Sequence, residues 1–361
     1  MLKSAQPPMP VDLLGQPLET LQQWVMDWGQ PRFRALQIYH ALYAERVLEF
    51  ERMTTLPRPF RELLRREATV ALPTQSQQFR SADGSVRYLL RLPDRDGVQP
   101  AAVETVDMPS ANRRTLCIST QAGCAVNCRF CLTAQLGLVR NLTAGEILGQ
   151  ILVVLQQGPQ RPRTNIVFMG QGEPLLNYEA TLMATRILLD PRAFGISPRR
   201  VTLSTSGIVP AIERLAGEPV RPKLAISLNA TTDEQRSAIM PINRKYPLSQ
   251  LLEVCRRYPL RSWEKLTFEY VLLGGFNDAP DDARRLVRLL RGLRAKVNLI
   301  PWNPGPLPFR VPAAEAVEQF RETLIRGGVA AFIRYSRGRD VMGACGQLAL
   351  LETPAAAPVH P

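Results

Sequence analysis

From residue 115 onward, short apolar runs typical of buried strands alternate with longer amphipathic segments typical of helices. The apolar runs span residues 115–119, 165–169, 201–205, 224–228, 267–273 and 296–301. Helical spacing covers residues 178–189, 248–257 and 281–293, and a further helix begins at a capping-box pair, Thr143 and Glu146. Repeated strand-then-helix units require a parallel sheet with crossover helices. Because six units are too few for an eight-fold barrel, the pattern predicts an α/β fold with a partial (β/α)6 barrel, whose active residues lie at the carboxyl ends of its strands.

The segment before this repeat has a different pattern. Helical spacing over residues 13–28, 33–46 and 60–66 predicts a small helical domain, which we place at residues 1–72. Residues 77–108 alternate apolar and polar side chains, with Asp83-Gly84 and Asp96-Gly97 where hairpins would turn, so residues 73–110 are predicted to be a β-hairpin connector. We assign residues 111–350 to the catalytic domain and residues 351–361 to a flexible tail.

Charge and composition indicate which class of molecule the chain binds. The chain of 361 residues is 45% hydrophobic, which is enough for a large core, and it carries a formal net charge of +13. Residues 1–84 hold ten Lys and Arg against nine Asp and Glu, so twelve of the thirteen excess positive charges lie in residues 85–361. Such an excess indicates a solvated basic surface or, more often, a polyanionic partner such as nucleic acid.

Cysteine usage indicates metal or redox chemistry in the cytoplasm. No basic and apolar leader opens the chain and no run of about twenty apolar residues occurs in it, so we expect no export and no membrane span. In a cytoplasmic chain, six cysteines indicate metal binding more than a disulfide framework. Only two histidines are present, which disfavours histidine catalysis and a histidine-rich zinc site.

Three of the cysteines form one motif. Cys124, Cys128 and Cys131 follow the first predicted barrel strand in a turn-prone loop. Three thiolates can hold a [4Fe-4S] cluster and leave one iron open for a small chelating molecule. The alternatives are a zinc knuckle, for which a fourth nearby Cys or His is absent, and unrelated buried thiols.

The C-x-x-x-C-x-x-C spacing resembles the signature of the radical S-adenosylmethionine (SAM) superfamily. Residues 170–174, Gly-Gln-Gly-Glu-Pro, resemble the segment of that superfamily that receives the amino group of SAM. The resemblance implies a [4Fe-4S] cluster on the three cysteines and SAM contacts at Gly172, Glu173, Ser204, Ser227, Leu228, Asn229 and Asn303. From the residues alone, each of the last five is equally well a strand-end cap or turn residue.

Further segments of the sequence resemble one family within this superfamily. Residues 114–119, 140–142, 204–207, 239–247, 300–304 and 337–348 are similar to the RlmN/Cfr family of RNA methyltransferases, and the similarity extends from about residue 12 to residue 350. Gln171 and Asn229 depart from the family pattern, in which methionine and histidine are common at these two positions.

The family implies a role for three more residues. Cys345 would take a methyl group from one SAM, and a second SAM, cleaved at the cluster, would generate the radical that activates this methyl group for addition to adenine. Glu104 matches the base that removes the ring proton, and Cys117 matches the thiol that releases the product, leaving a disulfide. Without the resemblance, Glu104 is an exposed strand glutamate and Cys117 a buried strand thiol, and the remaining thiol, Cys255, belongs to a helix core.

The amino-terminal helical segment and residues 133–135 and 240–243 resemble the commoner, adenine-C2 branch of the family, so we expect a monomeric adenine-C2 methyltransferase. Its implied substrates are 23S rRNA and, in some tRNAs, the adenosine 3′ of the anticodon, and its implied electron donor is a carrier such as flavodoxin. Two alternatives stay open. A Cfr-type C8 methyltransferase would share the cluster, both catalytic cysteines and the SAM contacts, and a noncatalytic RNA-binding protein would use the iron–sulfur site for structure only.

Overall fold

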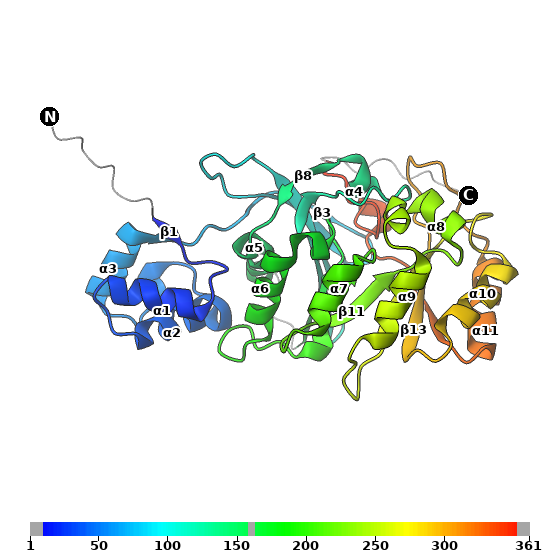
Figure 1. Cartoon of the computed structure of the whole chain (residues 1–361). Coiled ribbons are helices and arrows are strands. Elements are labelled where there is room, and N and C mark those ends of the chain that lie inside the picture. Colours follow the sequence, from blue (N-terminus) through cyan, green and yellow to red (C-terminus); the bar gives the residue numbers. More distant parts are fainter. Residues whose placement is uncertain (1–9, 158–162, 352–361) are drawn as a thin grey trace.

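A computed structural model describes residues 10–157 and 163–351 of the chain. A ten-stranded sheet runs through most of it, in the order β14-β13-β12-β11-β10-β9-β6-β5-β4-β3. The helices α1–α3 form a lobe of their own beside α5 and α6, at one end of the molecule (Figure 1). The predicted tail lies outside the described residues apart from residue 351.

The parallel part of the sheet is the partial barrel that the sequence predicts. Its strands are β6 (Arg113–Ile118), β9 (Thr164–Phe168), β10 (Val201–Thr205), β11 (Lys223–Ser227), β12 (Leu266–Leu272), β13 (Ala295–Pro301) and β14 (Ala330–Ile333). All six predicted strands are confirmed to within two residues. The seventh parallel strand, β14, is four residues long and was not expected.

Three antiparallel strands extend the same sheet beyond β6. They are β3 (Thr74–Arg80), β4 (Val86–Arg91) and β5 (Ala102–Ser110), joined as two hairpins whose turns contain Gly84 and Gly97. β5 pairs with β6 from Val106 opposite Cys117 to Ser110 opposite Arg113. The segment predicted as a hairpin connector is thus hydrogen-bonded directly to the barrel.

Helices cover the outer face of the parallel strands (Figure 1). They are α5 (Ala144–Gln156), α6 (Tyr178–Leu189), α7 (Val209–Ala216), α8 (Asp233–Ile239), α9 (Leu248–Arg257), α10 (Pro280–Leu290) and α11 (Ala314–Arg326). The predicted capping box begins α5: Thr143 Oγ1 accepts from the Glu146 N–H at 3.2 Å, and the Glu146 carboxylate accepts from the Thr143 N–H at 2.8 Å. Cys255 lies buried in α9, as expected.

The amino-terminal lobe consists of α1 (Leu18–Asp27), α2 (Phe33–His40), a π-helical turn over Ala41–Glu45 and α3 (Arg58–Glu67). A short parallel pair, β1 (Val11–Asp12) with β2 (Ala68–Thr69), closes it. The residues just after β1 pack directly on the first turn of α5, where an added Cβ on Gly145 would lie 2.6 Å from the Leu14 carbonyl oxygen. Apolar side chains of the lobe and of the barrel belong to one continuous core.

Candidate active site

One cavity of about 690 Å³ occupies the inside of the barrel. It extends from the carboxyl ends of the parallel strands to their amino ends. Ten of the predicted site residues line it: Cys124, Cys128, Cys131, Gly172, Glu173, Ser204, Ser227, Asn229, Asn303 and Cys345. The fold therefore gathers at one cavity thiols that lie more than two hundred positions apart in the chain.

The cluster loop is held between two short strands. β7 (Gln121–Gly123) and β8 (Leu138–Asn141) pair antiparallel, and the Cys124 N–H donates to the Gly137 carbonyl at 2.8 Å. At Gly123 the backbone is left-handed (φ +77°), and a Cβ would lie only 1.8 Å from the Gly137 oxygen, so only glycine fits. Asn127 is also left-handed (φ +58°), which bends the loop between the first two cysteines.

The three thiols fit an iron–sulfur cluster as donors. Burial raises the pKa of each, to about 12 for Cys124, and for Cys128 the other two thiols raise it further. Thiols in such a site must lose their protons to bind iron, so the metal must supply the missing positive charge. No three His, Cys, Asp or Glu side chains in residues 10–157 and 163–351 converge closely enough to hold a single metal ion. A cluster does not require this, because its thiolates bind different iron atoms.

The loop after β9 places Glu173 at the wall of the cavity. Its carboxylate accepts hydrogen bonds from the Leu175 N–H at 3.1 Å and the Ser206 N–H at 2.7 Å, which join the ends of β9 and β10. Burial raises the pKa of Glu173, while these donors act in the opposite direction. The residue is thus a buried acceptor with fixed orientation.

The ends of β10 and β11 are joined by a residue that sequence reasoning missed. Arg236 in α8 is fully buried, and its guanidinium donates to the carbonyl oxygens of Ser206, Ser227 and Leu228. Its positive charge also opposes the raised pKa of the Cys128 thiol. The sequence gives no signal for this role, because a single arginine on an amphipathic helix normally faces solvent.

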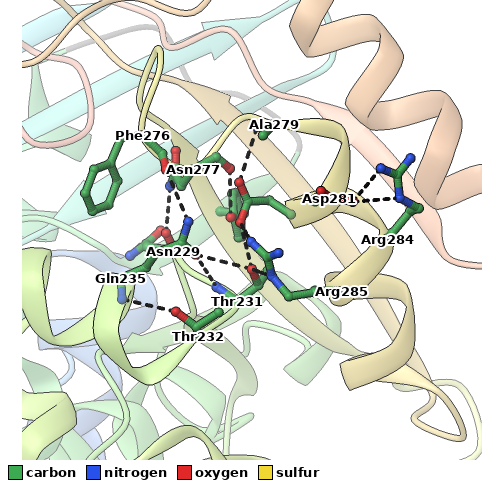
Figure 2. A network of polar contacts seen from close by, with 12 residues as sticks. Asn229, Thr231, Thr232, Gln235, Phe276, Asn277, Ala279, Asp281, Arg284 and Arg285 are labelled. Carbon is green, nitrogen blue, oxygen red and sulfur yellow. Dashed lines mark hydrogen bonds and ion pairs between the residues drawn. The ribbon is translucent and has the colours of Figure 1, made fainter.

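Leu228 differs from the other predicted SAM contacts. Its side chain is fully buried in the core and is not part of the cavity wall among the described residues. The next residue, Asn229, does reach the cavity, with a left-handed backbone (φ +60°). Figure 2 shows how Asn277 holds it: the Asn277 amide donates to the Asn229 carbonyl at 2.7 Å. Asn229 in turn accepts from the Val271 N–H at 2.9 Å.

The segment with Cys345 packs against the cluster loop. The Leu132 N–H donates to the Gly346 carbonyl at 2.7 Å, and the Asn303 amide donates to the Cys345 carbonyl at 3.1 Å. The Cys345 thiol is exposed to the cavity, where burial raises its pKa to about 11 and Ser336 lies within hydrogen-bonding reach. A methyl group on this sulfur would face the same cavity as the cluster thiols.

Glu104 and Cys117 lie behind the cavity wall, in the part of the chain that the structure describes. The expectation from the residues alone, that Glu104 is exposed, is wrong: it has 0% exposure and forms an ion pair with Arg87, which is equally buried. The Glu104 carboxylate also accepts from the Leu350 N–H at 3.0 Å. Cys117 is buried as expected and packs against Leu348. The residues that follow Cys345 therefore cover both side chains.

The amino end of the cavity is basic. Five cations at the starts of strands line it: Arg113, Arg199, Arg200, Lys223 and Lys296. Arg334, which follows β14, adds a sixth cation to the cavity wall. None of them forms an ion pair with a carboxylate of the described residues. Burial lowers the pKa of Lys223 and of Lys296, and neighbouring cations lower both further. This end of the cavity can therefore receive anionic groups.

Comparison with known proteins decides the family. The radical SAM superfamily matches residues 118–289, and the ribosomal RNA large subunit methyltransferase N-terminal domain matches residues 11–70. A probable dual-specificity RNA methyltransferase RlmN from Koribacter versatilis is 49% identical over 89% of this chain and 96% of its own length. The corresponding protein of Anaeromyxobacter dehalogenans is 49% identical over 94% of this chain and 91% of its own length. The chain belongs to the RlmN family.

One solved structure supports the same fold over nearly the whole chain. A radical SAM methyltransferase from Sphaerobacter thermophilus superposes with a TM-score of 0.87 and 42% identity, over 95% of this chain and the whole of that chain. As an RlmN family member the chain is an enzyme that uses a [4Fe-4S] cluster and SAM, which removes the noncatalytic alternative.

Two further expectations concern the disulfide and a membrane span. All six cysteines are free thiols in this structure, so the expected disulfide is not present in it. In the described part of the chain, no helix is both long and apolar enough to cross a membrane.

Proposed function

We propose that the chain methylates C2 of an adenosine in 23S ribosomal RNA and, in some tRNAs, of the adenosine 3′ of the anticodon, through a methyl group carried on Cys345. The single observation that carries this proposal is the shared cavity, which Cys345 lines together with Cys124, Cys128 and Cys131. When bound there, the cluster and SAM supply a 5′-deoxyadenosyl radical, which suits an aromatic carbon that is not nucleophilic. The names of the relatives, dual-specificity RNA methyltransferases, support RNA as substrate.

Different residues would bind the cluster and SAM. Cys124, Cys128 and Cys131 would hold the cluster. SAM would be held within the cavity by Gly172, Glu173, Ser204, Ser227, Asn229 and Asn303, which line it, together with the backbone of Leu228.

After the methyl carbon has bonded to the ring, Glu104 takes the ring proton. The Cys117 sulfur then bonds to the Cys345 sulfur as the C–S bond breaks, and the released carbon takes up the proton that the Cys117 thiol gives up. The one electron left over from the radical addition would pass to a one-electron acceptor such as the oxidised cluster. A cellular reductant reopens the disulfide. Both side chains act only after the covering residues beyond Cys345 have moved.

The basic end of the cavity supports a polyanionic substrate. Phosphate groups that flank an unstacked adenosine would meet the unpaired cations there. RNA affinity is therefore expected to fall log-linearly with salt, and Lys296→Met to lower the slope. We further infer a cytoplasmic monomer whose cluster receives electrons from a carrier such as flavodoxin.

Mass spectrometry tests the proposal. The chain is expressed in a bacterium that lacks its own enzyme of this type, and nucleosides from 23S rRNA and tRNA are analysed. We expect 2-methyladenosine in both RNAs, and none with Cys345→Ala. If 8-methyladenosine forms instead, the C8 alternative is correct. If rRNA and tRNA gain no methyladenosine, the substrate assignment is wrong.

A further inference from the structure

Glu104 lies where the hydrogen-bond ladder between β5 and β6 stops. The last pair of the ladder is Val106 opposite Cys117, and Glu104 would be opposite Ser119, beyond the end of β6. The Glu104 N–H donates instead to the side-chain oxygen of Gln171, at 3.3 Å. The Gln171 amide thus replaces the peptide group that a continued strand would have supplied.

The same amide reaches the carboxylate of Glu104. Gln171 Nε2 donates to Glu104 Oε2 at 3.4 Å, and the Gln171 side chain is buried with 1% exposure. Both ends of one amide therefore contact one residue. An apolar side chain at this position would leave a buried N–H and a buried carboxylate oxygen each short of one partner.

The backbone of Gln171 is anchored to the same strands. Its N–H donates to Ser119 Oγ at 2.9 Å, and this hydroxyl donates to the Glu104 carbonyl at 2.7 Å. The Gln171 carbonyl accepts from the Thr120 N–H at 2.9 Å. Because Gln171 directly precedes Gly172 and Glu173, the loop on the SAM side of the cavity and the strand with Glu104 are connected through this one residue.

The electrostatic surroundings of Glu104 are simple. Arg87 from β4 is the charged group that faces it among the described residues, whereas β6, the loop with Gln171 and the carboxyl-terminal segment present neutral groups. Burial raises the pKa of Glu104, and Arg87 and the Leu350 N–H oppose this increase. When the segment with Leu350 moves away, the Leu350 hydrogen bond is lost, but those from Arg87 and Gln171 belong to the sheet and its loop and remain.

We infer that Gln171 is a positioning residue for Glu104: its amide keeps the carboxylate oriented as a hydrogen-bond acceptor after the carboxyl-terminal segment has moved away. This inference rests on the proposed function, in which Glu104 takes the ring proton of the covalent RNA adduct. Gln171 itself does not touch the reacting atoms. Its effect is confined to the deprotonation step, because it acts through the ionisation and orientation of Glu104.

The test is Gln171→Met, which keeps the length of the side chain and removes the amide. Wild-type and variant holoenzyme are allowed to form the covalent RNA adduct, and the rate at which the adduct disappears is followed against pH. We expect a roughly tenfold lower rate at neutral pH and an acidic limb moved up by about one pH unit, because the ionised carboxylate loses a donor. Reductive SAM cleavage should be unchanged.

Gln150→Met is the matched control. Gln150 is equally buried and hydrogen-bonds Thr105 and Ser119, but it does not contact Glu104. It should lower thermal stability without moving the pH profile. If Gln171→Met does not fold, Gln171→Asn withdraws the amide by one methylene and should shift the profile in the same direction.

Two outcomes overturn the inference for different reasons. If Glu104→Ala resolves the adduct at the wild-type rate, the assignment of Glu104 as the base is wrong and the positioning role falls with it. If Glu104→Ala stalls while the Gln171 variants match the wild type at every pH, the proposed function stands and only the positioning role is refuted.

Discussion

The substitution Gly145→Ala adds one methyl group and tests how tightly the amino-terminal lobe is packed on the barrel. At Gly145, in the first turn of α5, an added Cβ would lie 2.6 Å from the Leu14 carbonyl oxygen and 3.1 Å from its carbon. At Gly15 it would lie 2.1 Å from the Gly145 nitrogen. These neighbours are backbone atoms, which cannot rotate away as a flexible side chain can.

Two effects of Gly145→Ala oppose each other. Alanine stabilises a helix interior by about 1 kcal/mol relative to glycine, and it stabilises the first turn, where Gly145 lies, by less than this. An added methyl group in a filled site costs about 1–3 kcal/mol, and a contact with backbone falls at the upper end of this range. The expected net result is a loss of about 1–2 kcal/mol in the free energy that holds the lobe against α5.

Hydrogen exchange read by mass spectrometry measures this loss. Amides in residues 11–70 of Gly145→Ala should exchange about tenfold faster, because about 1.4 kcal/mol corresponds to a factor of ten. Gly217→Ala is the control, since its Cβ would meet the nearest atom at 3.5 Å, an ordinary contact. If Gly145→Ala instead raises the melting temperature and leaves exchange in the lobe unchanged, the close approach of Leu14 to α5 is not a real constraint.

Three further predictions concern the cavity. Anaerobic reconstitution should load about four irons and four sulfides per chain. Replacing Cys124, Cys128 or Cys131 by Ala should abolish iron uptake and SAM cleavage. Binding of stoichiometric zinc without iron would contradict the iron–sulfur assignment. Cys117→Ala should accumulate RNA covalently bound to Cys345, seen as a ribonuclease-sensitive gel shift that Cys345→Ala lacks; normal turnover of Cys117→Ala would refute both roles. Burial raises the pKa of Glu269 from 4.5 to about 7, so the folded chain retains a proton that the unfolded chain loses, and stability should fall as pH rises from 4.5 to about 7. Glu269→Gln should flatten this dependence in urea titrations at several pH values.

Periodicity predicted the regular elements well where side chains alternate cleanly between core and solvent. The observed α6 (Tyr178–Leu189) and β10 (Val201–Thr205) have the expected bounds. The first helix was expected from residue 13 but begins at Leu18, because Leu13 and Leu14 are buried in the turn that contacts α5. The strand β14 was missed because it is short and alternates around only one buried residue, Ala331.

The same limit applies to the candidate site: a motif within one short segment could be predicted, and contacts between distant residues could not. Local spacing placed Cys124, Cys128 and Cys131 in one loop, since a cluster motif is contained in eight residues. The burial of Glu104 could not be predicted locally, because its partners are Arg87 on the neighbouring strand and the Leu350 N–H, 246 positions further along the chain. Buried charges depend on such distant partners, and a single sequence does not reveal which residues the fold will pair.

The position of Cys345 near the end of the chain has a consequence for incomplete copies of the protein. A product that stops before residue 338, through premature termination or proteolysis, would retain every strand of the sheet and the whole cluster loop. It would lack Cys345 and the residues whose Leu348 and Leu350 cover Cys117 and Glu104. Under the proposed function, such a fragment would keep the cysteines that hold the cluster but would have no acceptor for the methyl group, so it would cleave SAM without methylating RNA.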